Sequence, residues 1–312
     1  MPIGVGDVLG VIKRAAVGFW NDQCPRMAAA LSYYTIFSLP PLLILLIMVA
    51  GLFLDPQDVQ GAIEAQIASL IGPEGAVQVR EMIRNADRPT GGMRIATVLG
   101  VGALIFGATG AFVNLQTALN DAWHVEPDPK QGGIKNFIVK RIFSFGLVLA
   151  VAFLMLVSLS LAAALSAVGN TVGGGLPEVM LVVLNFIVSF AVITFLFAAM
   201  YKVMPDASIA WRDVWVGAVG TATLFVIGKF LLGFYLGRSD PGSAFGAAGS
   251  LALVLVWVYY ASMIVLFGAE FTQEWAQERG GGIRPEKGAT RVVEQKKRVR
   301  PGQPPEVETK SA

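Results

Sequence analysis

The sequence has few of the residues on which soluble enzymes rely. Among 312 residues only 15% are charged, and there is one cysteine, Cys24, and one histidine, His124. A single cysteine excludes an intramolecular disulfide, and a single histidine excludes a multi-histidine metal site. The formal net charge is only +2, and Lys and Arg are dispersed except at the two ends, so no basic cleft for nucleic acid is visible. We therefore expect neither a cofactor nor a nucleic-acid partner.

Long apolar runs are what the chain has in abundance. Hydrophobic residues make up 54% of it, and the mean hydropathy is +0.62. A helix crosses a bilayer with roughly 20 mainly apolar residues, because no water satisfies its backbone in hydrocarbon. Six runs fit this requirement, at 28–54, 95–119, 142–168, 178–201, 214–236 and 248–271. The sequence predicts an all-α integral membrane protein with six transmembrane helices, whose main partner is the lipid bilayer.

The segments outside the runs each have a character of their own. At 1–27, apolar residues recur at helical spacing with basic residues on another face, which predicts an amphipathic helix at the inner membrane interface. Its apolar positions are Val5, Leu9, Ile12, Ala16 and Phe19. The loop at 55–94 is predicted to be helical and to cap the outer side. The tail at 277–312 is rich in Gly, Pro and charge, which predicts a disordered basic segment that either contacts anionic lipid or only fixes the topology.

The distribution of basic residues gives the orientation. Lys and Arg are most frequent in cytosolic segments close to the spans. With the N-terminus inside, most of the flanking basic residues lie in the cytosol, and the tail reinforces the bias. The outer loops then hold only Arg80, Arg84, Arg88, Arg94 and Arg238. Both termini are therefore predicted to be cytosolic, with the first span remaining in place as a signal anchor.

Three separated motifs resemble a known family. They are AAALSYYTIFSLPPLL at 28–43, TALNDAWHV at 117–125, and GAAGSLALVLVWVYY at 246–260 followed by FGAEF at 267–271. In this order they resemble the YihY/BrkB family, and the likeness extends to about residue 277. The resemblance implies a six-helix protein of the bacterial inner membrane, with transport suspected. It also implies an old label, ribonuclease BN, which the residues argue against because His124 alone cannot build a nuclease metal site.

Polar groups at membrane depth are candidate functional residues, because they are costly to bury there. Lys229 lies well inside the run at 214–236. Its long stem either carries the ammonium group to the outer interface or points inward. In the second case Asn185, at similar depth in the oppositely directed run before it, is a candidate neighbour.

Glu270 is the second candidate, at the cytosolic edge of the last run. Several polar residues fall at similar depth and are predicted to line a vestibule open to the cytosol, among them Tyr33, Tyr34, Asn114, Asn120 and Asp213. Alternatively, Glu270 pairs with Arg212 or Lys202 and only fixes the end of its helix. Pro40 and Pro41 are predicted to break or kink the first span, which frees backbone carbonyls.

Two functional classes remain open at this point. The first is a transporter or export factor for a small or amphipathic molecule, with its vestibule around Glu270. Six spans are few for a solute pathway, which favours a homodimer. The second is a non-transporting scaffold of the cell envelope, in which the polar residues only hold helices together. An enzyme is not expected, because no nucleophile and base stand at recognisable spacing.

Overall fold

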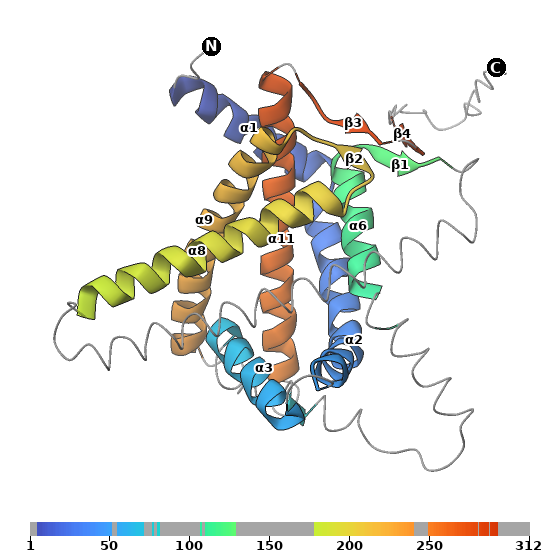
Figure 1. Ribbon diagram of the computed structural model, residues 1–312. Helices are drawn as coiled ribbons and strands as arrows, with labels where there is room; N and C mark the ends of the chain where they lie inside the picture. Colours follow the sequence, from blue (N-terminus) through green and yellow to red (C-terminus); the bar gives the residue numbers. More distant parts are fainter. Residues whose placement is uncertain are drawn as a thin grey trace, which may run out of the picture.

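The computed structural model describes residues 5–51, 55–71, 77, 80–81, 107, 110–128, 178–239, 249–279, 281–286 and 288–292. These residues are almost entirely helical (Figure 1). The helices are α1 (Val5–Asn21), α2 (Cys24–Ala50), α3 (Pro56–Ile71), α6 (Gly110–Ala122), α8 (Glu178–Val203), α9 (Trp211–Ser239) and α11 (Gly249–Glu278).

Among the described residues, four helices are long and apolar enough to cross a membrane. Their apolar stretches are Cys24–Ile44, Phe186–Val203, Trp211–Leu232 and Leu251–Glu278. This confirms a mainly helical chain with several membrane-spanning helices. The predicted span at 142–168 and most of that at 95–119 lie outside the described residues, so the count of six stays a prediction.

Helix α11 is the element around which the others gather. It packs against α1, α2, α6 and α9, and it runs through the middle of the molecule (Figure 1). Helix α1 and the short strands lie at one end, and α3 lies at the other. The helix ends at Glu278, beyond the predicted end of the span at 271. Its last turns are polar but contain good helix formers, and they continue because α1 packs alongside them.

Helices α9 and α11 run antiparallel and fit together through two matched pairs of small residues. A methyl group at Gly217 of α9 would overlap the Thr272 hydroxyl of α11, and one at Gly268 of α11 would overlap the Thr221 hydroxyl of α9. Each threonine also donates a hydrogen bond to the glycine carbonyl four residues earlier on its own helix. Thr221 donates to the Gly217 carbonyl of α9, and Thr272 donates to the Gly268 carbonyl of α11. Close backbone approach at small residues is the usual basis of helix association in membranes.

Helix α1 has two apolar faces. Val11, Ala15 and Phe19 are buried, whereas Leu9, Ile12 and Trp20 are exposed. The predicted apolar stripe is thus divided, because Phe19 packs against Phe267 of α11 while Leu9 and Ile12 face outward. The helix ends at Asn21, and α2 begins at Cys24, so the boundary lies before the predicted residue 27.

An ion-paired contact fastens α1 to the end of α11. Arg14 forms ion pairs with both Glu274 and Glu278. The same Arg14 is largely exposed, so the contribution of each pair to stability is small. On α3, within the predicted helical loop, Glu64 pairs with Arg80, whose guanidinium holds the pKa of the Glu64 carboxyl below its usual range.

The predicted disordered tail is wrong for its first part. Strand β3 (Arg284–Pro285) pairs antiparallel with β2 (Ala207–Ser208), and β4 (Ala289–Arg291) pairs antiparallel with β1 (Val125–Pro127). The tail segment therefore ties the residues after α6 to the residues after α8. Residues 293–312 lie outside the described residues.

Of the predicted break or kink at Pro40 and Pro41, the break is not found, because α2 continues as one helix through both prolines, and the kink stays a prediction. Nearby, the Ser38 hydroxyl accepts a hydrogen bond from the Ala111 amide of α6 at 3.1 Å. The helix is therefore held to a neighbour just before the proline pair. Neighbouring helices commonly make such prolines tolerable within membrane spans.

The α9–α11 contact gives a direct prediction. Gly217→Ala should lower the free energy of unfolding by about 1–3 kcal/mol, because the new methyl group has no space beside Thr272. Denaturant titration in mixed micelles measures this change. Gly61→Ala on α3 is the matched control, since a methyl group there has no neighbour within 4 Å and alanine favours a helix. Equal stability of the two variants would contradict the packing described.

Candidate functional site

The Glu270 carboxyl lies buried where α1, α2 and α11 meet. The residue is only 2% exposed. Its Oε1 accepts a hydrogen bond from the Cys24 thiol at 3.6 Å, and its Oε2 lies so close to Gly18 that a Cβ there would be 2.6 Å away. The Asp22 carboxyl is within hydrogen-bonding reach of it. Because a hydrogen bond between two carboxyl groups needs a proton on one of them, the pair is suited to holding a proton.

A tight turn between α1 and α2 places these neighbours. The Asp22 amide donates to the Gly18 carbonyl at 2.8 Å and ends α1. Gln23 follows with φ of 56°, in the left-handed region, and its carbonyl accepts from the Arg26 amide at the start of α2. The reversal within so few residues brings Asp22 and Cys24 onto the same face of α11. The sole cysteine and an aspartate therefore reach Glu270 together.

Buried donors from two other helices bind the backbone of α11 beside Glu270. Trp123, after α6, donates its indole N–H to the Ala269 carbonyl at 3.0 Å. Tyr201 of α8 donates its hydroxyl to the Val265 carbonyl at 2.7 Å and also contacts the Thr221 hydroxyl at 3.0 Å. Hydrogen bonds between helices hold their relative positions in the membrane. The backbone around Glu270 is thus fixed from several sides.

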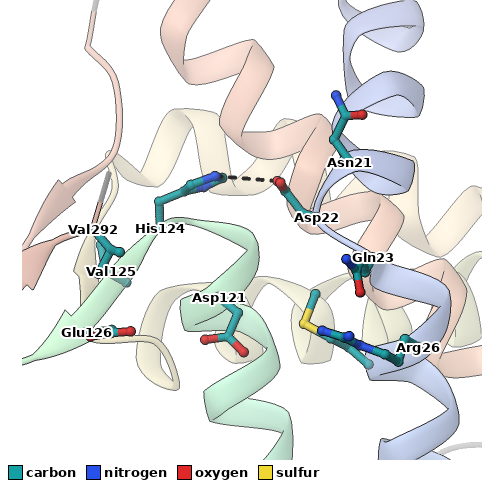
Figure 2. A pocket seen from close by; sticks show the side chains of 10 residues that line it. Asn21, Asp22, Gln23, Arg26, Asp121, His124, Val125, Glu126 and Val292 are labelled. Carbon is teal, nitrogen blue, oxygen red and sulfur yellow. Dashed lines mark ion pairs between the residues drawn. The ribbon is translucent and has the colours of Figure 1, made fainter. Parts of the chain in front are cut away.

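A polar cavity of about 210 Å³ adjoins the site (Figure 2). Its lining residues come from the α1–α2 turn, the end of α6, β1 and the residue after β4: Asn21, Asp22, Gln23, Arg26, Met27, Asp121, His124, Val125, Glu126 and Val292. In Figure 2 the His124 ring points toward Asp22, with Nε2 and Oδ2 3.7 Å apart. His124 has φ of 54° in the short turn between α6 and β1, which aims its side chain at the α1–α2 turn. Asp22 therefore belongs both to the cavity and to the surroundings of Glu270.

A second polar cluster joins the end of α6 to the residues after α8. The Asn120 side chain donates to the Asp206 carboxylate at 2.8 Å, and its carbonyl oxygen accepts from the Asp206 amide at 2.8 Å. The Gln116 amide group lies 3.5 Å from both oxygens of the same carboxylate. The Asp206 carbonyl accepts from the Glu286 amide, which extends the cluster to the tail segment. These bonds join three segments that are far apart in the sequence, which fits a structural role.

The other predicted site residues fall in separate places. Asp213 is buried in the first turn of α9 and is paired with Arg212 at 3.6 Å, while Asn114 donates to the Gly110 carbonyl of its own helix. Tyr33 and Tyr34, 58% and 45% exposed, lie on the surface of α2 and not in an enclosed vestibule. The structure thus places Glu270, Asn120 and Asp213 in the interior at this end of the molecule, and the two tyrosines outside it.

The alternative pairing of Glu270 with Arg212 or Lys202 is not found. Arg212 pairs with Asp213, and the Lys202 ammonium donates to the Ile209 carbonyl at 2.6 Å. Lys229 is half-buried on α9. The side chain of Asn185 lies outside the described residues, so its pairing with Lys229 stays a prediction.

Asp22, Cys24 and His124 are the site residues that sequence reasoning missed. In the sequence, the single cysteine Cys24 only excludes a disulfide, and the single histidine His124 only excludes a multi-histidine metal site. One signal was available: the polar stretch NDQC separates two apolar helices at 21–24. The predicted topology puts this turn on the cytosolic side, the same side as Glu270.

These features define a polytopic helical membrane protein with a buried acid at the junction of its first and last described long helices. A sequence model of the family described as "Virulence factor BrkB" matches residues 15–292. The chain therefore belongs to the BrkB family of membrane proteins, as its motifs implied.

Curated relatives carry the name UPF0761 membrane protein, which states no activity. The one from Rhodospirillum centenum is 27% identical over 91% of this chain and 61% of its own length. Those from a Psychrobacter species and from Pseudomonas aeruginosa are both 29% identical, over 81% and 80% of this chain and 46% and 59% of their own lengths. The chain thus spans about half to three-fifths of the relatives it matches. No solved structure matches it.

The Asn120–Asp206 pair gives a prediction that separates structural from functional polar groups. Asn120→Ala and Asp206→Ala should each lower the free energy of unfolding by about 1–3 kcal/mol, because each leaves a buried polar partner unsatisfied. The double variant should lose less than the sum, since either change alone removes the bond between the two side chains. Denaturant titration of all four proteins measures the coupling. Strict additivity would show that the two residues do not interact.

Proposed function

We propose that this chain is a membrane transport protein in which Glu270 is the group that responds to the transported solute or its coupling ion. The observation that carries the proposal is the burial of the Glu270 carboxyl. Within the described part of the chain it forms no ion pair with Lys or Arg, although it is 2% exposed. A buried carboxylate without a counter-charge is costly, and a bound proton or cation removes that cost.

The contrast with the other buried polar groups supports this reading. Trp123, Tyr201, Thr221 and Thr272 all donate to backbone carbonyls of the helices. Trp123 and Tyr201 thereby join neighbouring helices, whereas the two threonines bond within their own helices, and the donor of each group is already engaged. Glu270 instead faces a thiol and a second acid, and the acid reaches a polar cavity. Ionisable groups in this kind of setting are commonly functional.

The proposed orientation places this cavity on the cytosolic side of the bacterial inner membrane. The bias of Lys and Arg toward the flanks on this side supports it. The exposed apolar residues Leu9, Ile12 and Trp20 of α1 then lie at the inner interface, where amphipathic helices bind. The basic tail would face anionic lipid on the same side.

A structural scaffold of the cell envelope is the second candidate. The matched Gly217–Thr272 and Gly268–Thr221 contacts and the bonds to α11 carbonyls favour it, since they make the bundle rigid around α11. If the chain is a scaffold, replacing Glu270 by a neutral residue changes the stability of the protein, and no solute moves across the membrane through it.

The test compares solutes inside and outside cells of a deletion strain that produces either the native chain or Glu270→Gln. Transport predicts a metabolite or lipid that redistributes with the native chain and stays at the deletion-strain level with Glu270→Gln. Untargeted mass spectrometry of cells and medium measures it, at matched amounts of protein in the membrane.

Asp58→Asn is the matched control, because Asp58 is an exposed carboxylate on α3, at the opposite end of the molecule from the cavity (Figure 1). It should behave as the native chain does. Profiles of the native chain that equal those of the deletion strain would contradict transport and leave the scaffold in its place.

A further inference from the structure

Three titratable side chains form a line from the cavity to the buried carboxyl. Their exposure decreases along it: the His124 side chain is 34% exposed, that of Asp22 is 23% exposed, and Glu270 is 2% exposed. The distance from His124 Nε2 to Asp22 Oδ2 is 3.7 Å, and Asp22 is within hydrogen-bonding reach of Glu270. Each group therefore stands close to the next, from the cavity to the interior.

We infer that this line is a proton pathway, in which Glu270 exchanges a proton with the cavity through Asp22 and His124. The inference rests on the proposed function and specifies the proton as the coupling ion. In the inward direction, the imidazolium gives the proton on Nε2 to the Asp22 carboxylate through a bridging water, because 3.7 Å is too long for a direct hydrogen bond, and Asp22 passes a proton to the Glu270 carboxylate. A proton from the solvent, carried as hydronium into the cavity, then restores the imidazolium and leaves water. No other bond is made or broken, and no oxidant or reductant is needed.

Packing around Glu270 favours a proton over a metal ion. Oε2 lies against the backbone of Gly18, and Oε1 accepts from the Cys24 thiol, so the ligands of a coordinated cation would have to share the space beside both oxygens with these neighbours. In the residues that the structure covers, no group of three or more His, Cys, Asp and Glu side chains is arranged to hold a metal ion. A proton needs no such space.

The charges that surround the pathway come from every element packed against it. Glu270 faces Asp22 from the α1–α2 turn and Cys24 from α2, and Glu274 lies one turn further along α11, where Arg14 of α1 pairs with it. On the cavity side, Arg26, Asp121 and Glu126 share the lining with His124 and Asp22 (Figure 2). The acids outnumber the bases, which favours protons near the entrance.

Infrared difference spectroscopy after a rapid pH change tests the pathway. The full chain is reconstituted in lipid, and the carboxyl band that disappears in Glu270→Gln is assigned to Glu270. In the native chain this band should respond quickly to the pH change. Asp22→Asn and His124→Asn should each slow the response by about two orders of magnitude, which is typical for loss of a positioned proton-transfer group.

The variants are chosen so that the fold survives. Asparagine tolerates the left-handed backbone of His124, where φ is 54°, better than most residues do. Asp22→Glu keeps an acid at the same place and should retain the fast response, even if Asp22→Asn is less stable. Asp58→Asn removes an exposed carboxylate on α3, at the opposite end of the molecule from the cavity, and its response should equal that of the native chain.

Two results would overturn the inference. One is a native spectrum without a band that depends on Glu270, and the other is a response as fast in Asp22→Asn and His124→Asn as in the native chain. Because the spectra report protonation and not solute movement, the pathway can fail while redistribution of a solute in cells still supports transport. Equally, a fast, Asp22-dependent response with no redistributed solute would support the pathway and contradict transport.

Discussion

The Glu270 carboxyl is buried among a thiol, a second acid and a glycine. The structure around it depends on this burial. Only a glycine at position 18 leaves space for Oε2, and only a short turn after α1 brings Asp22 and Cys24 to the same carboxyl. The extension of α11 to Glu278 supplies the turns on which α1 packs. The end of the molecule that carries α1 and the strands is thus organised around one acid.

The rest of the bundle holds that end in place. Tyr201 and Trp123 bind successive turns of α11 through the Val265 and Ala269 carbonyls, and α9 meets α11 through glycine and threonine pairs. Such contacts need little solvation change and resist displacement in lipid. A rigid frame around a buried, ionisable group is the arrangement that functional sites commonly show, because stability elsewhere compensates for the cost of the site.

The sequence was sufficient for the four long apolar helices that the structure describes, because apolar length alone determines which segments can enter the bilayer. It was less informative on their ends: α11 continues through TQEWAQE, which has no apolar signal but packs on α1. The strands β3 and β4 were missed because segments of two and three residues carry no alternation pattern. Depth along a helix also does not determine direction around it, and so Tyr33 and Tyr34 were grouped with Glu270 although they face outward.

The stability of Glu270→Gln, measured as its thermal unfolding midpoint in lipid or detergent, tests the central claim that Glu270 is kept for function. Glutamine has the same shape, accepts from Cys24, donates to Asp22 and carries no charge. If the acid is retained at a cost to the fold, the midpoint should be equal to or higher than that of the native chain. A lower midpoint would show that the carboxyl itself stabilises the junction, and it would contradict this account.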